Sequence, residues 1–146
     1  MKRKYLEELL DFTVGMELGR GISRTVYEYS PDKTLVLKFE RDGSHWFQNV
    51  IEWETWCEAR AMGKSVARWL AKCHSISADG RWLLMVRTTP LVGKLPRQMP
   101  GFLTDFKREN YGMIGRQIVC HDYGTNLAMN RGMSSRGLRT AHWSTD

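Results

Sequence analysis

The stretch RTVYEYSPDKTLVLKFE (24–40) contains two runs of β-branched, aromatic and aliphatic residues on either side of the breaker sequence PDKT (31–34). This pattern is typical of two strands joined by a tight turn. The preceding stretch FTVGMEL (12–18) has the same character and is separated from it by GRGIS (19–23). Three consecutive strands with short connections predict an antiparallel meander.

A helical pattern follows these strands. Residues 44–62 place apolar side chains at helical spacing, and Ser44 and Gly63 are the expected N-cap and C-cap. Three tryptophans in this segment are expected in the core rather than on a base-stacking surface: Trp46, Trp53 and Trp56.

Two further strands and a small hairpin are predicted downstream. The stretches KCHSIS (72–77) and WLLMVR (82–87) have strand character. Residues 88–101 carry several prolines and glycines and are expected to form a loop, whereas MIGRQIVCH (113–121) predicts a hairpin. We therefore expect the α+β fold class, with an antiparallel five-stranded sheet and one long helix.

Composition indicates one folded domain across residues 1–146. The chain is 42% hydrophobic and 26% charged, and it contains no repeat, low-complexity tract or linker. Acidic residues interrupt the apolar character of residues 1–12, which predicts a short amphipathic helix rather than a signal peptide. The longest apolar runs are too short for a membrane span. We therefore expect a cytoplasmic protein with no membrane partner.

The net charge and the cysteine content give weaker indications of what the protein binds. The net charge of +6 fits either a solvated basic surface or the attraction of an anionic ligand. Cys57, Cys73 and Cys120 lack the C-x-x-C spacing of zinc ligands, so reduced, buried thiols are expected. In the polar tail, solvation is favoured over nucleic-acid binding for three arginines: Arg131, Arg136 and Arg139.

Two short polar motifs carry the strongest chemical signal. TDFKRENYG holds Asp105, Lys107 and Asn110 in D-x-K-x-x-N spacing, and CHDYG holds Asp122. Carboxylate and amide oxygens are the ligands that Mg²⁺ prefers, and a lysine suits phosphate. A polar turn followed by a helix-capping aspartate is the structural alternative. The joint spacing favours a site for Mg²⁺ and a nucleotide triphosphate.

With these motifs the chain resembles the protein kinase-like superfamily over about residues 14–124. GRG (19–21) resembles the Gly-rich loop, WLLMVRT (82–88) the fifth strand and hinge, DFKREN the catalytic loop, and DYG the metal-binding motif. The resemblance implies a kinase-like N-lobe at about 14–87. It also implies a much reduced C-lobe at 88–146, which carries the catalytic loop and the DFG-like hairpin.

The resemblance also assigns the phosphate-binding parts. Lys38 matches the lysine of the third strand, and Glu52 is the helix glutamate that orients it, with Glu54 as the less favoured alternative. Position 24 is Arg where many kinases have a third glycine, which predicts either a stiffer loop tip or a side chain that contacts phosphate. Contacts to ATP are expected from these residues: Gly19, Gly21, Val26, Lys38, Met85 and Arg87.

The resemblance also assigns catalytic roles to residues of the two polar motifs. Asp105 is expected to position the acceptor hydroxyl and accept its proton, and Lys107 to neutralise charge on the transferred phosphoryl group. Asn110 and Asp122 are expected to hold Mg²⁺. Gly124 is expected to permit a bend after the metal ligand.

The chain departs from typical kinases in its C-terminal half. Leu103 and Thr104 replace the His and Arg that usually precede the catalytic Asp, and no A-P-E string follows Gly124. An apolar surface near Leu103 and Tyr123 is therefore expected to stay uncovered and to bind a protein partner or a second copy. This reduction looks like the very small kinase-like proteins of phages and other mobile elements.

We expect an enzyme that transfers the γ-phosphoryl group of Mg-ATP to a Ser, Thr or Tyr hydroxyl of a partner protein or of itself. The alternative is a kinase-derived binding module that inhibits or scaffolds a partner with little catalysis. A weaker third hypothesis, suggested by the basic charge, is a kinase acting on a small molecule or on RNA.

Overall fold

The computed structural model describes residues 2–124, 133 and 137–144. Within this described part, no helix is both long and apolar enough to cross a membrane. Some tail residues lie outside the described part: the arginines Arg131 and Arg136, and four residues whose hydroxyls could accept phosphate in self-modification, Thr125, Ser134, Ser135 and Thr145.

The elements of the first half are bounded as follows: α1 Arg3–Thr13, β1 Val14–Arg20, β2 Arg24–Tyr29, β3 Leu35–Glu40, α2 Gln48–Met62, α3 Lys64–Ala67, β4 Cys73–Ile76 and β5 Trp82–Val86. Those of the second half are β6 Gln98–Pro100, the 3-10 helix η1 Arg108–Asn110, β7 Tyr111–Ile114, β8 Gln117–Cys120 and β9 Leu138–Thr140.

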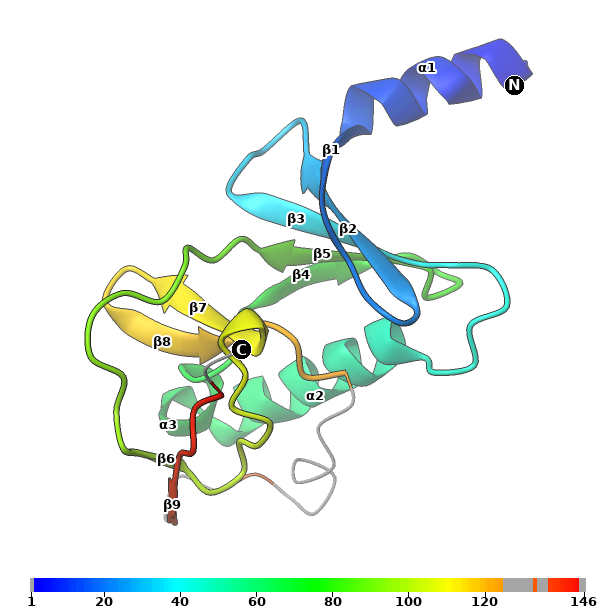
Figure 1. Ribbon diagram of the computed structural model, residues 1–146. Helices are drawn as coiled ribbons and strands as arrows, with labels where there is room; N and C mark the ends of the chain where they lie inside the picture. The colour runs from blue at the N-terminus through cyan, green and yellow to red at the C-terminus, as the bar shows by residue number, and fades with distance from the viewer. Residues whose placement is uncertain (1, 125–132, 134–136, 145–146) are drawn as a thin grey trace.

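The first half forms a five-stranded sheet with the strand order β1-β2-β3-β5-β4. All neighbouring strands are antiparallel, so the predicted meander and five-stranded antiparallel sheet are confirmed. The long helix α2 lies along one face of the sheet and contacts β3, β4 and β5 (Figure 1). The protein therefore has the expected α+β class, and the sheet and α2 together place Lys38 and Glu52 opposite one another.

Helix α2 begins later than the sequence indicates. Its N-cap is Phe47, which adopts a φ of 51°, and its first helical residue is Gln48. The N-cap predicted at Ser44 is wrong, because the Ser44 hydroxyl donates a hydrogen bond to Glu40 at the end of β3 (2.7 Å). Gly63 ends the helix as predicted, with a φ of 106° and its N–H bonded to the last turn.

This later start changes the expected burial of several side chains. Trp56 is buried and Trp53 is half-buried, but Trp46 precedes the helix and is exposed, so its predicted core position is wrong. Cys73 and Cys120 are buried as expected, whereas Cys57 lies on the outer face of α2 and is exposed.

The second half contains two small two-stranded sheets. The predicted hairpin is confirmed as β7 and β8, which turn at Gly115 with a φ of 61°. The segment predicted as a loop at 88–101 contains β6, which pairs with β9. The sequence does not reveal this pair because β9 is short and polar, and β6 includes a proline.

The buried apolar side chains of both halves form one cluster. It joins Leu83 and Met85 of the sheet to Leu103 and Tyr123 of the second half. Leu103 and Tyr123 are fully buried, so the predicted apolar surface around them is absent from the described part of the chain. Both side chains are members of the buried cluster, which also contains Met133.

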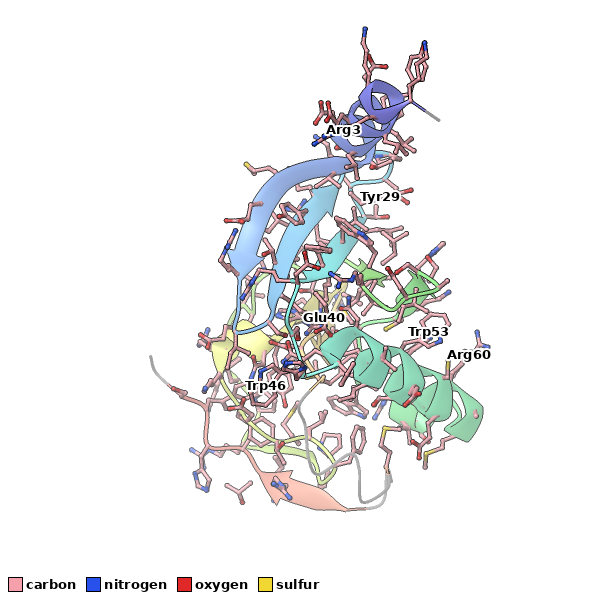
Figure 2. All side chains as sticks on the ribbon, turned by 90° about the vertical axis from the view of Figure 1, so that its right-hand side faces the viewer. Arg3, Tyr29, Glu40, Trp46, Trp53 and Arg60 are labelled. Carbon is pink, nitrogen blue, oxygen red and sulfur yellow. The ribbon has the colours of Figure 1, made fainter. Side chains whose placement is uncertain are left out.

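The exposed apolar side chains gather instead near the N-terminus. Helix α1 has no buried residue and projects away from the sheet beyond β1 (Figure 1). Figure 2 shows this helix nearly end-on, with its side chains spreading into open space. The exposed large apolar residues of this region are Tyr5, Leu6, Leu9, Leu10, Phe12 and Met16.

Candidate active site

A buried ion pair connects the sheet to helix α2. Lys38 lies within β3, between β2 and β5, and its Nζ is 2.9 Å from Glu52 Oε1. Glu52 is 0% exposed because it lies on the buried face of α2, whereas Glu54 is on the exposed face. Of the two glutamates that the sequence offers as the partner of Lys38, the structure therefore brings Glu52 to it.

The second oxygen of Glu52 binds the segment that follows β8. Oε2 accepts hydrogen bonds from the backbone N–H groups of Tyr123 (2.8 Å) and Gly124 (2.9 Å). A Cβ on Gly124 would lie 2.9 Å from both Cβ and the backbone oxygen of Gln48, closer than real packing permits. Gly124 has no positive φ, so it serves this close approach rather than the expected bend.

Arg24 joins the same carboxylate from β2. Its two terminal nitrogens lie 2.7 and 2.9 Å from the two oxygens of Glu52. One of them also contacts Asn49 Oδ1 at 3.1 Å, and the other contacts Asp122 Oδ1 at 3.0 Å. The sequence suggested either a stiff loop tip or a phosphate contact for Arg24. The structure instead turns its side chain inward, so that Glu52 is shared by two cations.

The charges of this cluster determine the pKa of its central carboxyl. Burial by itself would raise the pKa of Glu52, but the nearby Arg24 and Lys38 outweigh it and lower that pKa to about 2. Burial likewise opposes the charged form of Arg24, yet Glu52 and Asp122 raise the Arg24 pKa overall. Every buried side-chain nitrogen and oxygen in the described part has a hydrogen-bond partner. Glu52 and Arg24 therefore both stay charged at neutral pH.

Asn49 is a member of this cluster that the sequence analysis missed. Its amide nitrogen donates to the backbone oxygens of Lys38 (3.0 Å) and Arg81 (2.8 Å), and its backbone N–H donates to Glu40 (2.6 Å). These bonds hold the first turn of α2 against β3. The signal that could have found it is the spacing of three residues from Glu52, which places both on one helix face.

The Gly-rich stretch forms a tight connection between β1 and β2. The N–H of Gly21 donates to the oxygen of Arg24 (2.8 Å), and Arg41 donates to the carbonyl oxygens of Gly21 (2.6 Å) and Ile22 (2.8 Å). A Cβ on Gly19 would meet nothing within 4 Å, so that position faces open space. Arg41 was missed because a basic residue after a strand carries no distinctive pattern.

Three expected ATP contacts lie on β2 and at the end of β5. Val26 pairs with Lys38 across the sheet and is half-buried against the core. Met85 is fully buried, because the alternation along β5 directs it into the core. Arg87 forms an ion pair with Glu28 of β2 at 2.9 Å. Val26 thus lies beside Lys38, whereas the side chains of Met85 and Arg87 are engaged elsewhere.

The D-x-K-x-x-N motif forms a compact, exposed loop. Asn110 Nδ2 donates to Asp105 Oδ2 at 2.9 Å and to the Asp105 backbone oxygen at 3.1 Å. Lys107 Nζ lies 3.9 Å from Asp105 Oδ1. Asp105 has a φ of 52°, and such strained conformations cluster at functional sites. Phe106 anchors the loop by packing against Tyr111 and Trp143.

His121 joins this loop to the buried cluster. Its N–H donates to the backbone oxygen of Asn110 (2.9 Å), and its own backbone oxygen accepts from Lys38 Nζ. Its ring contacts Thr88 Oγ1 at 2.7 Å and the backbone oxygen of Glu109. Burial and the nearby Lys38 lower the pKa of His121, which favours the neutral ring. The sequence carries no signal that assigns this histidine to the site.

Two oxygen-bearing side chains are suited to a magnesium ion. The Asp122 carboxylate and the Asn110 amide oxygen have the hard donor chemistry that Mg²⁺ prefers. In the described part, no three His, Cys, Asp or Glu side chains converge as a metal site. A Mg²⁺ ion would therefore depend on phosphate oxygens and water for its other ligands, and it would meet an Asp122 already paired with Arg24.

Comparisons of the sequence with known proteins give no match. No protein-family model matches the chain, and no curated protein sequence matches it significantly. The interpretation of the site therefore depends on the residues and contacts of this chain alone.

Proposed function

We propose that this protein is an ATP-dependent phosphotransferase with a protein kinase-like N-lobe and a reduced C-lobe. The observation that carries the proposal is the double use of Glu52. One of its oxygens binds Lys38, and the other binds the backbone of the segment 122–124. Phosphoryl transfer in protein kinases requires both a lysine–glutamate ion pair and an aspartate that holds Mg²⁺, and Glu52 would connect the two here.

The position of each residue in the site suggests its role in nucleotide binding. Lys38 would bind the α and β phosphates, because its ammonium group is held by Glu52 and by the backbone oxygen of His121, the residue before Asp122. Asn110 and Asp122 would hold Mg²⁺, which would screen the negative charge of the triphosphate. The open space above Gly19 allows phosphate oxygens to approach the backbone there.

The acceptor would be handled by the loop at 104–110. Asp105 is more than half exposed, which leaves its carboxylate accessible to an incoming hydroxyl group. Asp105 would accept the proton of that hydroxyl, and Lys107 would neutralise charge on the moving phosphoryl group. We propose a Ser, Thr or Tyr hydroxyl of a partner protein or of the chain itself as the acceptor.

The test is transfer of labelled γ-phosphate from ATP, with the protein alone and with a cell lysate. We expect Asp105→Asn to lower the rate at least about 100-fold, because the positioned base is lost. Asp11→Asn on α1 is the matched control, since it changes an exposed carboxylate that is far from Asp105 in the sequence. Equal rates for the two variants would contradict the proposal.

A specific observation favours a second candidate, a kinase-derived binding module with little catalysis. Arg24 occupies one oxygen of Asp122, and the N–H groups of Arg87 and Thr89 donate to Thr34 (2.8 Å) and Met113 (2.9 Å). Asp122, proposed for metal, and the backbone that follows β5, where the hinge is expected, are thus already bonded within the protein. Nucleotide binding without any phosphoryl transfer would select this candidate.

A further inference from the structure

We propose that Arg24 is a built-in cation of the nucleotide site, so that the protein binds ATP without a divalent metal ion. This inference rests on the proposed function, because it concerns the same triphosphate-binding site. Its basis is the contact between Arg24 and Asp122, the aspartate that a magnesium ion would otherwise neutralise.

Arg24 is held in place from several sides. Its guanidinium group is 5% exposed and makes hydrogen bonds to Glu52, Asn49 and Asp122. Its backbone oxygen accepts hydrogen bonds from Gly21 (2.8 Å) and Arg41 (2.7 Å). A buried guanidinium with all these partners is a fixed part of the site, because withdrawing it would leave carboxylates unpaired.

The neighbouring residue strengthens this attachment. Ser23 Oγ donates to Gln48 Oε1 on α2 at 2.6 Å, so Ser23 and the side chain of Arg24 are both bonded to the start of α2. Figure 2 shows Glu40 between the sheet and the start of α2. Glu40 accepts a hydrogen bond from the backbone N–H of Asn49 at 2.6 Å, which fixes the start of α2 beside Arg24.

The charge balance explains why a metal ion would be less necessary. Lys38, Arg24, Glu52 and Asp122 together carry two positive and two negative charges. Without Arg24 the same group would have a net negative charge beside the place proposed for the triphosphate. Repulsion between Asp122 and phosphate would then have to be overcome by Mg²⁺. With Arg24 present, that repulsion is already reduced.

Asp122 is not closed to a metal ion. Its side chain is 44% exposed, although one oxygen is bound to Arg24. Mg²⁺ can therefore still approach, but it meets a carboxylate whose charge is partly neutralised. The proposal predicts a small effect of Mg²⁺ on ATP affinity rather than a metal requirement.

The experiment measures ATP binding by calorimetry, once in MgCl2 and once in EDTA. We expect the dissociation constants of the natural protein to agree within about tenfold. Binding in MgCl2 but not in EDTA would overturn the role of Arg24 and leave the proposed function standing. Binding in neither buffer would overturn both.

Variants at Arg24 sharpen the result. Arg24→Gln should weaken ATP binding in EDTA by at least about tenfold and restore a strong dependence on MgCl2, because Asp122 loses its partner. Arg60→Gln, which changes an exposed arginine of α2, is the matched control and should bind like the natural protein in both buffers. Metal-independent binding by Arg24→Gln would contradict the proposal.

A double variant keeps the test decisive if Arg24→Gln folds poorly. In Arg24→Gln/Asp122→Asn the unpaired carboxylate is gone, so folding and ATP binding in EDTA should both recover relative to Arg24→Gln. Circular dichroism and thermal unfolding report the folding of each variant. A double variant that folds but binds ATP only with MgCl2 would overturn the inference.

Discussion

The buried cluster around Glu52 and the N-terminal helix α1 have opposite arrangements of charge and apolar surface. In the cluster, charged side chains are inside: Glu52 is 0% exposed and Lys38 is 4% exposed. In α1, apolar side chains are outside: Leu9 is 52% exposed and Phe12 is 73% exposed. Both arrangements are contrary to the usual distribution of residues between core and surface.

The comparison shows where the stability of the protein depends on paired charges and where single side chains contribute little to it. Each buried charge of the cluster is matched by another charge or a hydrogen bond, so removing one member leaves its partners uncompensated. The apolar residues of α1 contribute almost no burial in this chain, so removing one changes few contacts. Substitutions should therefore be costly in the charged region and mild in the apolar one.

The largest effect is expected for Glu52→Gln. The change leaves Arg24 and Lys38 buried without their shared carboxylate, and it should lower the free energy of unfolding by about 3–5 kcal/mol. Denaturant unfolding measures this value. Glu54→Gln is the matched control on the exposed face of the same helix and should remain within about 0.5 kcal/mol. Similar losses for both variants would contradict the importance of the cluster.

The pH dependence of stability should also reveal the contribution of the Glu52 carboxyl group. The pKa of Glu52 is about 2 in the folded protein and near the ordinary glutamate value of 4.5 when unfolded. Because the folded pKa is lowered, its stabilising contribution is present above pH 4.5 and is lost as the pH falls toward 2. Thermal unfolding between pH 2 and 6 should therefore be less pH-dependent for Glu52→Gln. Identical pH slopes in the two proteins would show that other groups account for acid unfolding.

A smaller loss is expected for Gly124→Ala. The added methyl group would lie 2.9 Å from Gln48 and would push the segment 122–124 away from α2. We expect a loss of about 1–3 kcal/mol in unfolding free energy, typical of overpacking. Gly19→Ala serves as the control because its Cβ would meet nothing within 4 Å. A Gly124→Ala protein as stable as the control would mean that Gln48 yields easily.

The smallest effect is expected on α1. Leu9→Ser should change the unfolding free energy by no more than about 0.5 kcal/mol, because Leu9 has no buried contacts in this chain. Leu83→Ala, in a fully buried position of β5, should cost about 2–5 kcal/mol by comparison. If Leu9→Ser proved as destabilising as Leu83→Ala, α1 would have to be covered in solution.

Most of the first half of the fold was predictable from local patterns. The alternation in β2 and β3 and the breakers between them predict the meander, because strand faces repeat every second residue. The C-cap of α2 was predictable because Gly63 has the positive φ that other residues avoid. The pairing of Lys38 with Glu52 also follows from periodicity, since Glu52 lies on the packed face of α2.

The remaining features depend on contacts between distant parts of the chain. Pairing of β6 with β9, burial of Leu103 and Tyr123, and the start of α2 at Gln48 have no strong local signal. Neither role that the sequence suggested for Arg24, a stiffer loop tip or a phosphate contact, includes its inward ion pairs. An arginine in a loop motif has many solvated conformations, and only the position of Glu52 and Asp122 selects the inward one.

The sequence by itself determined the five strands, the helix that covers them, and the close spacing of Asp105, Lys107 and Asn110. These depend on side-chain periodicity and on residues only a few positions apart. The tertiary structure alone decided that Arg24 would share Glu52 with Lys38 and bind Asp122. The physical reason is that a charge can be buried only where opposite charges converge, and these residues converge from β2, β3, α2 and the segment after β8.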